Sequence, residues 1–69
     1  MTKRELINIL KDSIKDGWIT FKDPSDRKGA LECLKDGDLD FFFTTYEDAI
    51  ATGQDAFDSL RDETEGLED

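Results

Sequence analysis

The fold class is decided by residues 17–24, which read Gly-Trp-Ile-Thr-Phe-Lys-Asp-Pro. Four of the five residues at 18–22 are β-branched or aromatic, which is the composition of a strand. This segment lies between Gly17, a residue type that ends helices, and Asp23-Pro24, a pair that starts them. A short strand set between two helices predicts an α+β domain.

On the N-terminal side of this segment, the sequence predicts a helix over residues 3–16. Thr2 followed three residues later by Glu5 has the spacing of a capping box. One broad helical face then carries the apolar side chains Leu6, Ile7, Ile9, Leu10 and Ile14. Gly17 ends the pattern.

On the C-terminal side, a second helix is expected to begin at Pro24, behind the cap residue Asp23, and to end at Gly37. Ala30, Leu31 and Leu34 supply its apolar face. Gly29 in its interior weakens the helix when it is considered alone.

Residues 39–43 alternate in the manner of a strand. Leu39, Phe41 and Phe43 share one face, and Asp40 and Phe42 share the other. The pattern predicts a second strand whose outer face carries Phe42 as an exposed aromatic anchor beside carboxylates.

A last helix is expected to begin at a cap formed by Thr44 with Glu47, or by Thr45 with Asp48. Its apolar side would carry Tyr46, Ala49, Ile50, Gly53, Ala56, Phe57 and Leu60. The predicted order is therefore helix, strand, helix, strand, helix, with a short two-stranded sheet covered by helices. Either strand orientation is allowed. Residues 1–63 would form one small domain, and residues 64–69 an acidic tail that frays.

The charge of the chain is large and unevenly distributed. Its 69 residues contain 18 Asp and Glu against 9 Lys and Arg, with no His, which gives a net charge of -9. Residues 1–35 hold 8 basic and 6 acidic side chains, whereas residues 36–69 hold 12 acidic side chains and a single basic one, Arg61. A single-sign surface of this kind attracts basic partners and repels nucleic acids and anionic membranes.

On the predicted last helix, the acids fall on the side opposite the apolar stripe. Asp is also a poor residue for a helix interior, so this face departs from what folding alone would favour. We expect the binding surface for a basic, nucleic-acid-binding partner protein to consist of Glu47, Asp48, Asp55, Asp58 and Asp62, together with Asp38, Asp40 and Phe42.

In length and charge, the chain resembles the small acidic inhibitors that phages encode, such as DNA-mimic antirestriction proteins and some anti-CRISPR proteins. The resemblance covers these two properties and assigns no role to any residue. It implies a viral inhibitor that acts in the host cytoplasm by offering carboxylates where a partner binds phosphates.

Two other interpretations are compatible with the sequence. The acidic face is merely solvated in a small structural or accessory protein, for instance a homodimer. Alternatively, Asp36, Asp38, Asp40 and Glu47, with Thr44, bind calcium, because they occupy ligand positions of a 12-residue EF-hand loop. Phe41 stands where that loop requires glycine.

Catalysis is not expected. The chain has no His to act as a base, and Cys33 between Leu31 and Leu34 is typical of a small buried apolar residue. There is no glycine-rich phosphate loop, and no cofactor is predicted. The N-terminal residues lack the apolar stretch of a secretory signal, so a cytoplasmic protein is expected.

Overall fold

The computed structural model describes residues 1–67. In chain order, its elements are α1 (Lys3–Asp16), β1 (Thr20–Phe21), α2 (Pro24–Asp36), α3 (Leu39–Thr45), β2 (Ile50–Thr52), α4 (Gln54–Glu63) and the 3-10 turn η1 (Thr64–Gly66). β1 and β2 form an antiparallel two-stranded sheet. The small α+β domain is confirmed, and the predicted order holds with one further helix, α3, placed before the second strand.

α1 has the predicted bounds. The backbone N–H of Glu5 donates to Thr2 Oγ1 at 3.2 Å, which satisfies one of the free donors of the first turn. Leu6, Leu10 and Ile14 are buried on one side of the helix. At its end, the chain turns through Gly17 with φ 87°.

α2 is also as predicted. Asp23 Oδ1 accepts from the backbone N–H of Ser25 at 3.0 Å and from its hydroxyl at 2.9 Å, and these two bonds hold the pKa of the Asp23 carboxyl below its usual value. A Cβ at Gly29 would lie 2.7 Å from the hydroxyl of Tyr46, the residue that follows α3, so the end of this side chain lies directly over Gly29. The glycine that weakens α2 alone therefore leaves room for the Tyr46 ring end against this helix.

The prediction of a strand over residues 39–43 is wrong, because these residues begin α3. Asp38 caps the helix, with Oδ1 accepting from Phe41 N–H at 3.2 Å. Leu39, Phe42 and Phe43 are all buried, a spacing of three and four residues that belongs to a helix. Residues 39–43 matched the alternation of a strand only because three aromatic residues are adjacent, which places an apolar residue at every second position.

The second strand lies instead at β2, inside the segment predicted as the last helix. Thr20 pairs with Thr52 and Phe21 with Ile50, with an irregularity between the two pairs. Gly53, with φ 93°, separates β2 from α4, so the last helix begins about ten residues later than the predicted caps. Tyr46 and Ile50 therefore do not belong to the apolar side of α4. That side consists of the buried Phe57 and the half-buried Leu60.

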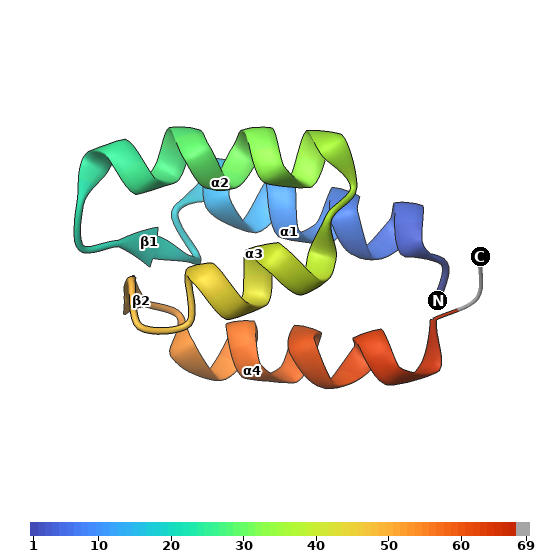
Figure 1. Cartoon of the computed structure of the whole chain (residues 1–69). Coiled ribbons are helices and arrows are strands. Elements are labelled where there is room, and N and C mark those ends of the chain that lie inside the picture. The colour runs from blue at the N-terminus through green and yellow to red at the C-terminus, as the bar shows by residue number, and fades with distance from the viewer. Residues whose placement is uncertain (68–69) are drawn as a thin grey trace.

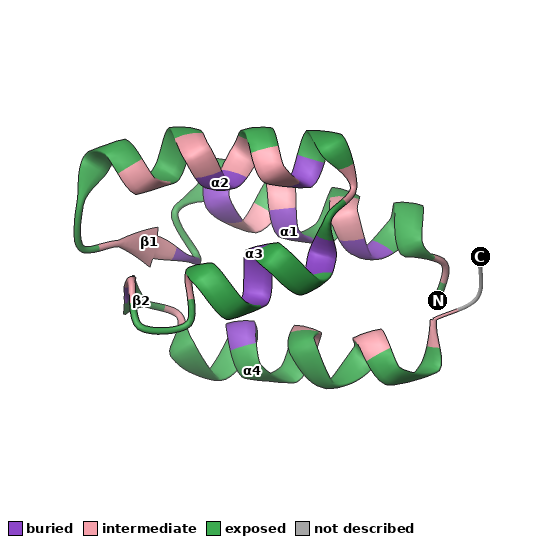
Figure 2. Ribbon diagram, viewed as in Figure 1, coloured by how far each residue is buried: buried purple, intermediate pink, exposed green. Residues whose placement is uncertain are grey.

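The core is shared by all the helices. In the view of Figure 1, α3 lies between α2 and α4, and the small sheet lies at one end of the molecule; α1 packs against both α2 and α4. The ring of Phe42 lies 5.2 Å from Phe43, 5.6 Å from Tyr46 and 5.6 Å from Phe57, measured between centroids. The buried residues face this centre, while the outer surfaces of the helices are exposed (Figure 2). No helix within residues 1–67 combines the length and apolar character needed to cross a bilayer.

The end of the chain continues past α4. Thr64 Oγ1 donates to the carbonyl of Arg61 at 2.6 Å, and Leu67 packs against the core. The predicted fraying of residues 64–69 stays a prediction, and residues 68 and 69 lie outside the described part.

Candidate partner-binding surface

Three of the predicted binding residues lie together on α4. Asp55, Asp58 and Asp62 are exposed, and a step of 100° per residue places them within about 60° of one another around the helix. The buried side of the helix, at Phe57, points the opposite way, toward α3 (Figure 2). Asp58 Oδ1 accepts from Gln54 Nε2 at 3.1 Å, and none of the three carboxylates forms an ion pair with any residue in 1–67.

Glu47 reaches the same surface through an ion pair. Arg61 Nη1 donates to Glu47 Oε1 at 2.9 Å, and both side chains are about half exposed. This hydrogen bond, and then the charge of Glu47, raise the pKa of the Arg61 guanidinium, with smaller contributions from Asp58 and Asp62. The surface made by Glu47, Asp55, Asp58, Arg61 and Asp62 is called the α4 acidic face below. Within this face, Arg61 neutralises the carboxylate of Glu47.

The other predicted acids are distributed differently from the expectation. Asp48 lies in the exposed turn between α3 and β2, not on a helix. Asp38 and Asp40 lie at the start of α3, and Asp38 uses its carboxylate to cap that helix. The structure thus divides the predicted set into the α4 acidic face and a separate group at the junction of α2 and α3.

At that junction is a small cavity of about 340 Å³. It is lined by Gly29, Glu32, Cys33, Asp36, Asp38 and Phe41. The Phe41 side chain is 56% exposed, so an aromatic ring stands beside three carboxylates. A cationic side chain of a partner would be attracted both to the aromatic ring and to the carboxylates here.

The exposed aromatic is therefore Phe41, and the prediction that Phe42 is an exposed anchor is wrong. Phe42 is fully buried because it lies with Leu39, Phe43 and Tyr46 on the inner side of α3. On a helical projection, Phe41 lies about 100–160° from each of these residues, on the outer side of the helix. The i, i+3, i+4, i+7 spacing of those four residues fits this helix, but the three adjacent aromatic residues fit the alternation of a strand equally well.

Trp18 is the second exposed aromatic residue, at 72% exposure. Its neighbour Ile19 is 1% exposed. Both residues lie in the bend between α1 and β1, where their backbone N–H groups donate to the carbonyl of Ser13, and this bend buries Ile19 and leaves Trp18 on the surface.

The calcium interpretation fails on geometry. An EF-hand needs its 12 residues as a loop, whereas seven of the residues in the window 36–47 form α3. Within residues 1–67, no group of three or more potential ligands is arranged to hold a metal ion.

Cys33 is half-buried and packs against the core. Its Sγ donates to the carbonyl oxygen of Asp38 at 3.4 Å. Burial, followed by the charges of Asp38 and Asp36, raises the pKa of the thiol above its ordinary value of 9.0. The thiolate is the nucleophile, so a raised pKa makes the thiol less reactive at neutral pH.

We expect iodoacetamide to alkylate Cys33 several-fold more slowly in the folded protein than in the chain unfolded by urea, when both are measured near neutral pH. The rate should rise when the pH exceeds the ordinary thiol value. Asp36→Asn should increase the rate because it removes one of the three causes, whereas Asp12→Asn, on α1, should leave it unchanged. Equal rates for the folded and unfolded chains would contradict this assignment.

Comparison with protein families, with curated proteins and with solved structures found no match to this chain.

Proposed function

We propose that the protein is a non-enzymatic acidic binding protein that occupies a basic, nucleic-acid-binding surface of a partner protein through the α4 acidic face. One observation carries the proposal: Asp55, Asp58 and Asp62 stand on a single exposed side of an ordered helix, without ion pairs to residues in 1–67. Phe57 fixes the rotation of α4 from the opposite side, so these carboxylates are held outward.

The spacing of the carboxylates supports attraction to a phosphate-binding surface. With a rise of 1.5 Å per residue, the seven steps from Asp55 to Asp62 cover about 10.5 Å. Three charges over this length give about one per 5 Å, against about one phosphate per 3.4 Å along a strand of DNA. The density suits a groove that normally binds phosphates, but it does not copy each phosphate position.

The test is capture of a partner by the immobilised protein from a lysate of the cell that produces it. We expect a nucleic-acid-binding protein to be retained at about 50 mM salt and largely lost at about 200 mM, because several ion pairs to the carboxylates are screened. Duplex DNA added to the lysate should compete for the same protein. Retention that neither salt nor DNA weakens would contradict the proposal, and so would the absence of any retained nucleic-acid-binding protein.

The charge-reversal variant Asp55→Lys with Asp58→Lys should abolish capture. Its thermal midpoint should stay within a few degrees of the parent protein, because both residues are exposed. The matched control is Asp12→Lys with Asp16→Lys on α1, where two exposed acids are reversed with the same change in net charge. Loss of capture in both variants would show that net charge matters and the α4 acidic face does not.

A further inference from the structure

Another cavity lies on a part of the molecule that is separate from the α4 acidic face. It is a groove of about 740 Å³ between α1 and α2, lined by Thr2, Lys3, Arg4, Ile7, Asn8, Lys11, Leu34 and Lys35. Its volume falls within the range of about 300–1,000 Å³ typical of sites for small molecules. We call it the α1–α2 groove.

Four of its eight lining residues are cationic and none is acidic. In a chain with twice as many acids as bases, mixing of charges would be expected to place carboxylates next to these cations. Yet Arg61 to Glu47 is the single ion pair among residues 1–67, so Lys3, Arg4, Lys11 and Lys35 have no carboxylate partner there. The groove is a local positive surface on an acidic protein.

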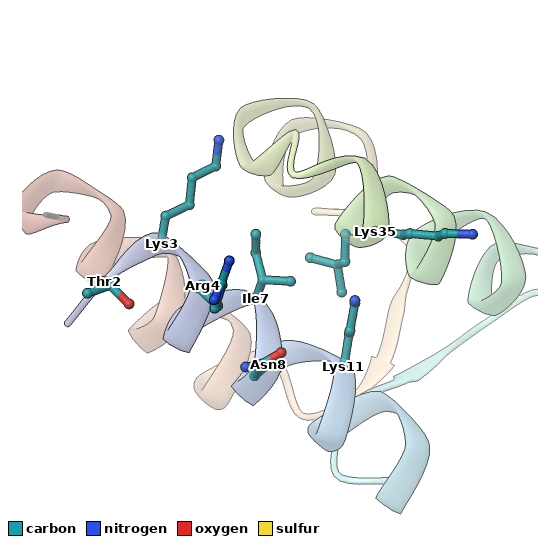
Figure 3. A pocket seen from close by; sticks show the side chains of 8 residues that line it. Thr2, Lys3, Arg4, Ile7, Asn8, Lys11 and Lys35 are labelled. Atoms are coloured by element: carbon teal, nitrogen blue, oxygen red, sulfur yellow. The ribbon is translucent and has the colours of Figure 1, made fainter. Parts of the chain in front are cut away.

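The side chains surround an apolar centre. Figure 3 shows Lys3, Arg4 and Lys11 extending from α1 around Ile7, while Lys35 extends from α2 with its ammonium directed away from Ile7. Leu34 is fully buried beneath the groove, and Ile7 is half-buried. An occupant would therefore meet charge at the rim and apolar surface at the floor.

The spacing of the cations indicates how long an anion must be to contact several of them. Arg4 and Lys11 are seven residues apart on α1, which is about 10.5 Å along the helix axis. A chain of linked phosphates spans such a distance and can contact several cations at once without drawing their side chains together. Arginine binds phosphate oxygens in a bidentate manner, and lysine binds them as a point charge.

We propose that the α1–α2 groove binds a small molecule that carries linked phosphates on an apolar or aromatic body, as a nucleoside triphosphate does. The phosphates contact Arg4, Lys11 and Lys35, and the body lies on Ile7. The acids next to the groove cations in the chain, Glu5, Asp12 and Asp36, form no ion pair with them, so the cations remain available to the phosphates. This proposal does not depend on the α4 acidic face.

The test is titration of the full chain with ATP, pyrophosphate and adenosine, followed by the amide NMR shifts of groove residues. A chelator is present, so that no metal ion links phosphates to the many carboxylates. We expect ATP to shift Ile7, Lys11 and Lys35 with saturation below about 1 mM, pyrophosphate to bind more weakly, and adenosine not to bind. No saturable shift with ATP would overturn the proposal.

Matched variants locate the site. Lys11→Glu with Lys35→Glu should weaken ATP binding at least tenfold. Lys15→Glu with Lys22→Glu, two exposed lysines outside the groove, should change it less than threefold. Equal weakening in both variants would show diffuse attraction to positive charge and would overturn the site.

A different occupant gives a different result. If the groove instead takes the acidic helix of a second copy, the protein self-associates as its concentration rises, and Lys11→Glu with Lys35→Glu abolishes that association. Sedimentation of the ligand-free protein measures this. Self-association that ATP does not reverse would overturn the proposal in favour of a protein occupant.

Discussion

Replacing Phe42 with alanine should unfold most of the protein. Phe42 is fully buried, and its ring packs against those of Phe43, Tyr46 and Phe57. Removal of a buried Phe side chain costs about 3–5 kcal/mol, because apolar contacts are lost and a cavity remains. A domain of this length has a free energy of unfolding of roughly 3–10 kcal/mol.

The measurements are urea unfolding and thermal unfolding, both followed by circular dichroism. Each kcal/mol lowers the thermal midpoint of a domain of this size by about 4–8 °C, so a fall of at least about 12 °C is expected for Phe42→Ala. The matched control is Phe41→Ala, one position away and 56% exposed. It should change the free energy of unfolding by about 0.5 kcal/mol or less.

These two variants also distinguish the helix α3 from a strand. In a strand over residues 39–43, Phe41 would point inward and Phe42 outward, so Phe41→Ala would be the damaging change. In the helix, Phe42 points inward. A large loss for Phe41→Ala with little effect of Phe42→Ala would therefore contradict the structure of this segment.

Gly53→Ala should be the second strongly destabilising change. Gly53 has φ 93°, a conformation that costs a residue with a Cβ about 1–2 kcal/mol. A Cβ there would also lie 3.1 Å from the Cα of Ile19 and closer still to the carbonyl oxygen of Trp18. The chain entering β1 must shift to make room, which brings the expected total to about 2–4 kcal/mol.

Gly17→Ala separates the two contributions to this loss. Gly17 has φ 87°, but no atom lies within 4 Å of the position its Cβ would take. It should lose only the conformational part, about 1 kcal/mol, in the same urea unfolding experiment. Equal losses for the two variants would show that the chain before β1 does not pack against Gly53.

The helices whose ends are marked by nearby capping residues, proline or glycine could be predicted from the sequence. The capping oxygens of Thr2 and Asp23, the proline at 24 and the glycines at 17 and 37 act within one or two turns of their own positions, so the bounds of α1 and α2 could be taken from the sequence. The three α4 acids were also placed on a common exposed side, because Phe57 and Leu60 define the opposite side by spacing alone.

The segment from 39 to 53 was not predictable in the same way. Three adjacent aromatic residues satisfy both the helical and the alternating period, so the pattern alone could not choose between them. The choice follows from Phe42, Phe43 and Phe57 meeting in one cluster, which only a helix at 39–45 allows. β2 likewise exists because Ile50 pairs with Phe21, a contact between segments distant in the chain.

The sequence by itself determined the α+β class, the two N-terminal helices, the excess of negative charge and its concentration after residue 35, because each depends on composition or on neighbours within a few positions. Tertiary structure alone decided that Phe41 is exposed and Phe42 buried, that Arg61 neutralises Glu47, and that Lys3, Arg4, Lys11 and Lys35 surround one groove. These features depend on which helix faces pack together, and that is set by the best burial of apolar surface over the whole chain.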